Sequence, residues 1–507
     1  MKKKIVIVIL ISIAIILCGV GLYVNLNKGE SKPKEDKFLE VDNNLVTKNI
    51  INNNELSEFD LYFLNEISKD KNTVYSPMSI KYALKLIDDM ANGESKDQIA
   101  KILNNYKITN FNNNDNITNL STIFITNNFK NSVNKSFKSD VNSDIVYFKN
   151  NEEINKYISN KTNNKITKIV EGEEYDFIVN NSLLIDMEWK NRIQALAETK
   201  PYFNVHYSHE DFSATVSSFE ERKDNFTFND KSNKDYAEFA SVINKYDIIN
   251  TIGLDNIKND ISTRYNNWLA SGSENACDTI DTTEEYVNKY ISEISANYKK
   301  IDSSTDYRYY IDDEVKVFSK ELKEYNGTKL EYIGIMPIKQ DLNTYANNLS
   351  VNKINNLINS LISIEYNNFE EGYITYIHGR IPLFKYNYDL ELTDNLKKLN
   401  IQDVFSYSKS DLSNIFKTNV YLDNIKNSTE ISFTNDGIKA SSITSAYGYG
   451  AGDCGFDYLF EVPVKEIDMT IDKPFIYLIR DKNTKEVWFI GSVNDASDYV
   501  KQINGTK

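Results

Sequence analysis

The sequence predicts an α+β fold in which most strands pair antiparallel. Helix-like patterns gather early in the chain, around residues 58–93, whereas strand-like runs dominate after residue 305. Such segregation is typical of α+β proteins, since α/β folds alternate helices and strands throughout. With 507 residues, of which 41% are hydrophobic, the chain is long enough to bury a large core.

The N-terminus carries three lysines, followed by an uncharged and mostly apolar run from Ile5 to Val24. As a helix this run is about 30 Å long, the thickness of the hydrocarbon core of a bilayer. We therefore predict a signal anchor or transmembrane helix at 1–24, with the lysines cytoplasmic and the rest extracytoplasmic. Cleavage near Gly19 and Gly21 would instead secrete the protein, and Leu17 disfavours a lipid anchor on Cys18.

The first elements after this segment follow from local patterns. Residues 25–54 are polar with charges of both signs, which predicts a solvated tether, and folding should begin near Glu55. Hydrophobic residues cover much of a helix in "SEFDLYFLNEI". Ser76 as N-cap and Pro77 at the first helical position predict the start of a core helix, which Gly93 should end.

Downstream, strands and helices can be assigned in order. The runs "TIFIT" and "YDFIVNNSLLIDMEW" predict strands, and "NEEINKYISNKTNNKITKIV" between them predicts a helix. One later helix is expected at "NLKKLN". The later strands are "KLEYIGIMPI", "GYITYIHGRIPLF", "STEISFT", "PFIYLIRD" and "EVWFIGSV".

Composition and reactive residues restrict the function. A net charge of −15 disfavours a nucleic-acid partner, whose phosphates would be repelled. Cys18, Cys277 and Cys454 allow at most one disulfide in the folded part, between the last two. We expect no enzyme, cofactor or metal. His206 and His209 in "HYSHED" leave a zinc-dependent hydrolase as an alternative to a solvated loop.

Residues 435–458, "NDGIKASSITSAYGYGAGDCGFDY", are small, flexible and aromatic in a chain that is otherwise short of glycine. Such a stretch cannot bury enough apolar surface to become ordered in a core. It suits an exposed and extended segment.

Eight segments in order resemble the serpin family over residues 55–191 and 305–496. They are "VYSPMSIKYALKLI", "EEINKYISNKTNNKI", "VNNSLLIDMEW", "YDLELTDNLKKLNIQDVFS", "DLSNI", "NDGIKAS", "DKPFIYLIRD" and "VWFIGSVND". The resemblance implies three mostly antiparallel sheets with surrounding helices and an exposed reactive loop. It places the serpin domain at 55–496, with the loop at 437–463, an inserted subdomain at about 200–304 and a tail at 497–507.

The resemblance implies a protease inhibitor that is a suicide substrate. A target serine protease cleaves the loop, forms an acyl-enzyme and is trapped when the loop enters sheet A as a new strand. Counting from the hinge glycine by family spacing gives Ala451 and Gly452 as the reactive bond, whereas counting back from "DKPF" places it nearer Pro463; Tyr449 and Tyr458 are other candidate cut sites. Ala451 suggests an elastase-like or subtilisin-like target, with a cysteine protease as another candidate. The hinge and the inward-facing positions after it are Gly437, Ile438, Ala440, Ser442 and Thr444.

Other positions match family positions that control opening of the sheet. Ser76, Ser79 and Asn181 match the polar shutter beneath it, and Trp189 matches the aromatic residue where insertion begins. Asn427 stands where the family carries a histidine, and Ile438 stands where inhibitors usually carry a small hydroxyl residue. This second departure keeps open the alternative of a non-inhibitory surface binding protein with the same fold.

Overall fold

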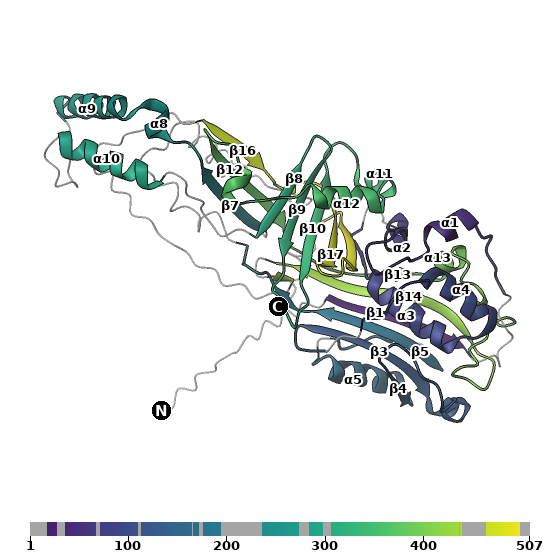
Figure 1. Ribbon diagram of the computed structural model, residues 1–507. Coiled ribbons are helices and arrows are strands. Elements are labelled where there is room, and N and C mark those ends of the chain that lie inside the picture. The colour runs from purple at the N-terminus through teal and green to yellow at the C-terminus, as the bar shows by residue number, and fades with distance from the viewer. Residues whose placement is uncertain are drawn as a thin grey trace, which may run out of the picture. The chain divides into compact units, whose positions relative to one another are not determined.

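The computed structural model describes residues 18–27, 36–66, 71–109, 113–164, 166–171, 176–193, 236–272, 283–297, 306–434, 437–438 and 463–496 (Figure 1). The chain divides into two compact units. The first comprises Met1–Phe59, Val74–Glu188 and Lys385–Ser442, and the second comprises Asp60–Thr73, Trp189–Phe384 and Ile443–Lys507.

The first unit is built on a six-stranded sheet. In spatial order its strands are β13 (Phe384–Glu391), β14 (Tyr421–Phe433), β1 (Cys18–Asn27), β5 (Phe177–Ile185), β3 (Ile117–Thr126) and β4 (Ser143–Phe148). Strands β3 and β4 pair in parallel, whereas β3 is antiparallel to β5 and β1 is antiparallel to both β14 and β5. Beyond β5, the short strand β6 (Met187–Glu188) pairs with β15 (Gly437–Ile438).

Helices of the first unit pack around this sheet. They are α1 (Asn43–Lys48), α2 (Glu58–Tyr62), which ends in the second unit, α3 (Pro77–Met90), α4 (Gly93–Leu103), α5 (Asn151–Lys161) and α13 (Thr393–Lys398). Helix α3 packs against β5 and β1. Short 3-10 turns lie at Asn127–Ser132 and Asp403–Phe405 in this unit, and at Phe63–Glu66 and Tyr366–Asn368 in the second unit.

The start of α3 confirms the prediction, whereas its end does not. Ser76 is the N-cap, because the Ser79 amide donates to its hydroxyl at 3.0 Å, and Pro77 is the first helical residue. The helix ends at Met90, and Gly93 begins α4 instead, with a φ of 52° that favours glycine. The predicted end at Gly93 is therefore slightly late, and α4 was not predicted.

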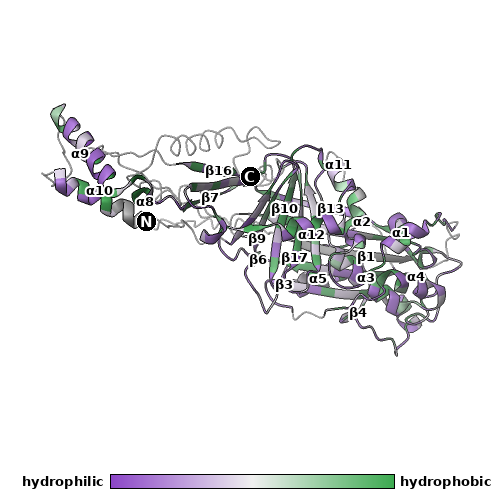
Figure 2. Cartoon of the chain, turned by 45° about the horizontal axis from the view of Figure 1, so that its top comes forward, coloured by the Kyte–Doolittle hydropathy of each residue, from purple (hydrophilic) through white to green (hydrophobic). Residues whose placement is uncertain are grey.

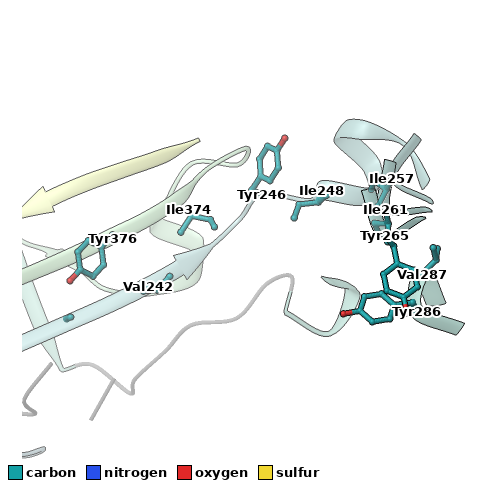
Figure 3. Close-up of a cluster of buried hydrophobic side chains, with 11 residues drawn as sticks. Val242, Tyr246, Ile248, Ile257, Ile261, Tyr265, Tyr286, Val287, Ile374 and Tyr376 are labelled. Carbon is teal, nitrogen blue, oxygen red and sulfur yellow. The ribbon is translucent and has the colours of Figure 1, made fainter. Parts of the chain in front are cut away.

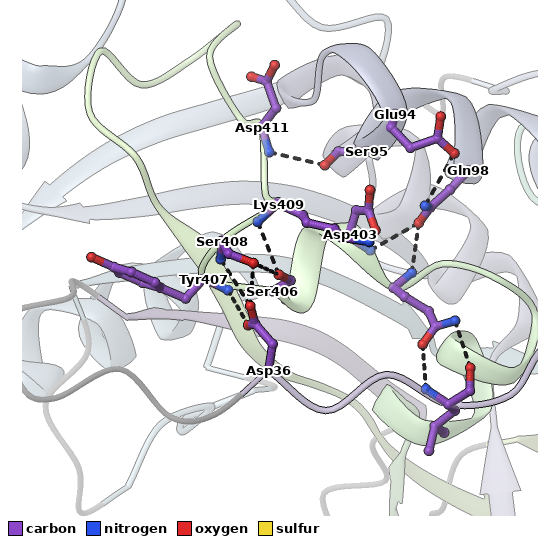
Figure 4. A network of polar contacts seen from close by, with 12 residues as sticks. Asp36, Glu94, Ser95, Gln98, Asp403, Ser406, Tyr407, Ser408, Lys409 and Asp411 are labelled. Atoms are coloured by element: carbon purple, nitrogen blue, oxygen red, sulfur yellow. Dashed lines mark hydrogen bonds and ion pairs between the residues drawn. The ribbon is translucent and has the colours of Figure 1, made fainter.

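The segment 36–54, expected to be part of a solvated tether, is held against the first unit. The Asp36 carboxylate accepts hydrogen bonds from the Tyr407 amide at 2.8 Å and from the Ser408 hydroxyl at 2.5 Å (Figure 4). Helix α1 follows, and Val46 and Ile51 are buried at 1% and 0% exposure. The sequence did not predict this packing, because the segment is mostly polar and two apolar residues are too few to form a helical or strand periodicity.

The expected membrane helix at 1–24 also differs from the structure. Residues 18–24, its last part, lie in strand β1, and residues 1–17 are outside the described residues. Among the helices that the structure describes, none is both long and apolar enough to cross a bilayer. A short uncharged run rich in Val, Ile and Leu is compatible with either a buried strand or a helix, so the sequence alone did not separate them.

The second unit carries most of a seven-stranded sheet and a three-stranded sheet. The larger has the order β11 (Ile362–Ser363), β8 (Tyr307–Ile311), β9 (Val315–Glu321), β10 (Leu330–Pro337), β17 (Phe475–Asp481), β18 (Val487–Val493) and β2 (Thr73–Tyr75). The smaller has the order β16 (Val464–Asp468), β12 (Ile374–Pro382) and β7 (Tyr236–Asn244). These sheets confirm the predicted α+β fold.

The described residues of the second unit form five further helices. They are α8 (Ile248–Ile252), α9 (Leu254–Ala270), α10 (Thr283–Asn297), α11 (Leu342–Asn347) and α12 (Val351–Asn359). Hydrophilic and hydrophobic residues alternate along α9 and α10 (Figure 2). Their apolar faces meet around Tyr265, whose ring stacks on Tyr286 with centroids 4.1 Å apart (Figure 3). These helices therefore belong to one hydrophobic cluster with residues of β7 and β12.

Candidate functional site

A buried polar cluster lies beneath the six-stranded sheet, where α3 begins. The Ser79 hydroxyl donates to the side-chain oxygen of Asn181 on β5 and approaches its carbonyl at 3.3 Å. The Ser76 amide donates to the side-chain oxygen of Asn427 on β14 at 3.0 Å. Ser76, Ser79, Asn181 and Asn427 are each at most 1% exposed. The N-terminus of α3 is therefore tied to both strands that flank β1.

Further residues that the sequence did not single out complete this polar cluster. Asn181 donates to the side-chain oxygen of Asn119 at 2.7 Å and to the Ser121 hydroxyl at 2.9 Å, both on β3. The Thr429 hydroxyl donates to Asn427 at 3.0 Å. The sequence did not indicate that these residues are buried, because the same polar residues are common in strands exposed to solvent. Only a paired strand places them next to Asn181.

The Asn427 side chain has one satisfied and one unsatisfied end. Its oxygen accepts from Ser76 and Thr429, whereas its nitrogen has no acceptor among the described residues. Asn427 is 0% exposed, so this nitrogen is shielded from water. A buried donor without a partner lowers the stability of the fold by about 1–3 kcal/mol. An acceptor placed beside the Asn427 nitrogen would therefore stabilise the fold.

The predicted hinge residues Gly437 and Ile438 form strand β15. Gly437 lies opposite Glu188 and Ile438 lies opposite Met187. The Gly437 carbonyl accepts from the Thr434 amide at 3.0 Å and from its hydroxyl at 2.8 Å, which closes a tight turn after β14. A Cβ atom at position 437 would lie 2.4 Å from the Met187 carbonyl oxygen. Close approach of β6, more than backbone freedom, requires glycine here.

Trp189, the remaining predicted residue of this group, belongs to the second unit. Its side chain is 3% exposed and packs edge-on against Tyr332, with ring centroids 6.0 Å apart. Its backbone forms an isolated bridge with Leu322. The structure therefore brings Ser76, Ser79 and Asn181 together within the first unit, while Trp189 packs within the second unit.

Several predicted residues lie outside the described residues. These are Ala440, Ser442, Thr444, Ala451, Gly452, His206, His209, Cys277 and Cys454. In the described part of the chain, no group of three or more His, Cys, Asp or Glu side chains is placed to hold a metal ion. His378, the histidine on β12, is buried and its Nε2 lies 2.7 Å from the Glu466 carboxylate.

Curated relatives match parts of this chain. Leukocyte elastase inhibitor A of Mus musculus is 27% identical over 170 residues, which are 33% of this chain and 41% of that protein. Serpin-Z1 of Arabidopsis thaliana is 29% identical over 118 residues, which are 23% of this chain and 24% of that protein. The matches thus span less than half the length of these relatives.

Solved structures share the fold over most of the chain. Native tengpin, a thermophilic serpin, has a TM-score of 0.51 at 19% identity and covers 93% of this chain and 99% of its own. Human thyroxine-binding globulin has a TM-score of 0.53 at 14% identity, with 87% and 96% covered. These likenesses establish the fold alone.

The family model "Serpin (serine protease inhibitor)" matches residues 53–239 and 290–496. Only 240–289 is left unmatched inside the domain, so the large insertion expected at 200–304 is wrong in extent. Its first described part is β7, a strand of the three-stranded sheet, while α8, α9 and the start of α10 occupy the unmatched segment. Because the match covers well over half of its length, this chain belongs to the serpin family.

Proposed function

We propose that this chain is an extracytoplasmic serine protease inhibitor that acts as a suicide substrate. The protease cuts the loop at 437–463, forms an ester through its catalytic serine, and is trapped when the loop enters the six-stranded sheet. The observation that carries this proposal is the pairing of Gly437 and Ile438 with β6. The first two residues of the loop already hold sheet positions directly beyond β5.

The trap works by stopping deacylation. Loss of one oxyanion-hole donor costs a protease about 10²- to 10³-fold in rate, so a distorted active site retains its ester for a long time. Insertion supplies the driving force, because each new ladder hydrogen bond contributes about 0.5–1.5 kcal/mol. The polar cluster at Ser76, Ser79, Asn181 and Asn427 acts as the shutter, since it ties α3 to both strands that flank the insertion site.

For the reactive bond we propose Ala451–Gly452, fourteen residues beyond Gly437. A small residue before the cut suits an elastase-like protease, and two relatives in Mus musculus and Rattus norvegicus are named leukocyte elastase inhibitor A. A subtilisin-like or cysteine protease is the other candidate target, and a panel of proteases separates them.

The test incubates the chain with elastase, subtilisin and a papain-like protease and looks for a complex that survives SDS. We expect such a complex with the target, and mass spectrometry of the released peptide should place the cut after Ala451. Ile438→Arg puts a charge at the first residue after the hinge glycine, where burial without a partner is costly. It should give more cleaved chain and less complex, whereas Ile438→Val should behave as the parent.

The second candidate function is a non-inhibitory binding protein with this fold. Ile438 in the hinge favours it, and human thyroxine-binding globulin shows that the similar structures include a protein named for binding a small molecule. In that case every protease would cut the loop as an ordinary substrate. No SDS-resistant band would appear, and cleavage would leave the melting temperature unchanged.

The location is part of the proposal. The lysines and the apolar run at 1–24 support export of the remaining chain. Protease added to intact cells should digest the protein, and N-terminal sequencing of the mature chain should show whether residues 1–24 are retained. Digestion only after cell lysis would contradict an extracytoplasmic location.

A further inference from the structure

Strands β1 and β15 pair with consecutive segments of the chain, β5 and β6. Along β6 and β5, Glu188 is opposite Gly437 and Met187 is opposite Ile438. The sequence of partners then resumes with Cys18 opposite Ile185 and runs to Leu26 opposite Phe177. Strand β15 is antiparallel to β6, and β1 is antiparallel to β5. Because β5 and β6 follow each other in the chain, a loop that continued from β15 along β5 would run in the same direction as β1.

The register fixes which loop residues would replace β1. If the loop continued from Ile438 one residue at a time, Lys439 would come opposite Asp186 and Ala440 opposite Ile185, where Cys18 now lies. By the same count, Thr444 would take the position of Leu22 and Tyr449 that of Asn27. Residues 440–449 and 18–27 therefore require the same ten positions.

We propose that residues 18–27 are an intramolecular placeholder strand that occupies the insertion site of the reactive loop. The loop can pass beyond Ile438 only after β1 leaves the space between β5 and β14. This inference rests on the proposed function, because the competition matters only if the loop inserts, and it applies to a mature chain that retains residues 18–27. Withdrawal of the N-terminal segment from the sheet would then control whether the chain traps a protease.

Both segments have the composition that a central strand needs. Residues 18–27 read "CGVGLYVNLN" and residues 440–449 read "ASSITSAYGY", with no charged side chain in either. A strand with a neighbour on each side needs uncharged residues that lose little on burial. Lys439, the one charged residue between the hinge and this stretch, would face Asp186 across the strands.

The chain also keeps β1 close to this position. Strand β1 ends with Asn27 opposite Tyr421, and the Tyr421 ring contacts Tyr407, whose amide donates to Asp36. Only residues 28–35 link β1 to this anchor, and a link of that length spans at most about 30 Å. Such a short link gives the segment a high effective concentration at the sheet.

The polar cluster gives the two occupants different partners. Leu22 lies opposite Asn181 in β5 and opposite Asn427 in β14, and residues directly opposite share one face of a sheet. Thr444 at that position would place a hydroxyl beside Asn427, whose nitrogen has no acceptor among the described residues. A leucine side chain cannot supply an acceptor. The loop is therefore the better matched occupant, and β1 is the displaceable one.

A disulfide lock tests the occupancy without reference to any protease. In the full-length chain, purified in mild detergent with Cys277 and Cys454 changed to Ser, Ile185→Cys is oxidised with oxidised glutathione. Directly opposite strand residues have Cα atoms about 4.5–5.5 Å apart, within reach of a disulfide. We expect Cys18 to link to position 185. Leu184→Cys, whose side chain faces the other side of the sheet, should not link to Cys18.

The same variants test the consequence. The locked chain should lose at least about tenfold of its rate of complex formation, and a reducing agent should restore it. Gly21→Pro removes a ladder donor from β1 and should speed complex formation, whereas Glu40→Pro, at an exposed site outside β1, should not.

The outcomes separate the two proposals. No disulfide at position 185 in a chain that still traps protease would overturn the placeholder strand and leave the proposed function standing. A disulfide at position 185 in a chain that traps no protease supports the occupancy of the sheet by β1 and refutes inhibition. If trapping is equally fast in the locked and reduced forms, β1 does not compete with the loop.

Discussion

At the scale of single residues, the hinge requires glycine at position 437 because there is no room for a Cβ atom. Gly437 has no Cβ, and one added there would lie 2.4 Å from the Met187 carbonyl oxygen and 2.6 Å from the Glu188 Cα. Both are backbone atoms, so neither can move aside cheaply. The sequence identified Gly437 as a hinge for its freedom to turn, but the structure makes it necessary for packing.

Gly437→Ala should therefore break the pairing of β15 with β6. At a position where alanine fits without strain, replacing glycine by alanine stabilises a protein by about 0.4–1 kcal/mol. A clash at position 437 would instead lower the stability, so the two cases change it in opposite directions. We expect a lower free energy of unfolding and faster amide hydrogen exchange at residues 187–188. Thr434→Ser keeps the hydroxyl that bonds the Gly437 carbonyl and should change neither. A more stable Gly437→Ala variant would contradict the close approach.

A second residue-scale prediction concerns Asp36 and pH. Burial acts to raise the pKa of Asp36, but hydrogen bonds from the Ser408 and Ser406 side chains and from backbone amides at 407 and 408 lower it below its ordinary value of 3.8. The folded state thus favours the carboxylate, which contributes stability above pH 3.8. That contribution is lost as pH falls through the lowered value.

The check is a comparison of the parent with Asp36→Asn. Chemical unfolding at a series of pH values should give a stability difference that is constant near neutral pH and shrinks below pH 3.8. Ser408→Ala removes one donor and should shift the onset of this loss to a higher pH. A difference that is independent of pH would show that the Asp36 bonds do not depend on its charge.

At the scale of elements, strong local signals were predictable and tertiary choices were not. The N-terminus of α3 follows from Ser76 and Pro77, because capping is a local interaction. The conformation of residues 18–24 does not follow from local sequence, since an uncharged apolar run is compatible with both a membrane helix and a central strand. Its position between β5 and β14 depends on strands about 160 and 400 residues away.

The element-scale prediction concerns the position shared by Leu22 and Thr444. After loop insertion the Thr444 hydroxyl should lie beside Asn427, where a missing acceptor costs about 1–3 kcal/mol. Thr444→Val should thus lower the melting temperature of the loop-cleaved chain and leave that of the intact chain unchanged. Ser445→Ala, one residue on and facing the other side of the sheet, is the matched control. Equal effects of the two variants would contradict this register.

At the scale of the whole molecule, the order of motifs in the chain predicted the family and its three sheets. The extent of the insertion was not predictable, because β7 is a strand whose partner, β12, lies in later sequence. The polar cluster was predicted in part: Ser76, Ser79 and Asn181 were found, whereas Asn119 and Ser121 are recognisable only once β3 pairs with β5.

Net charge gives the last prediction, since it acts over the whole surface. At −15, this chain attracts a basic protease and repels an acidic one at distances beyond contact. The Debye length falls from about 30 Å at 0.01 M salt to about 3 Å at 1 M. Stopped-flow association with a basic elastase-like protease should therefore slow as salt rises, and association with an acidic subtilisin-like protease should quicken. The rate of the later insertion step should hardly change, because it is intramolecular and Lys439 is the only charged residue between Gly437 and Ala451. If salt alters both steps alike, charges close to the loop, and not the overall field, determine encounter.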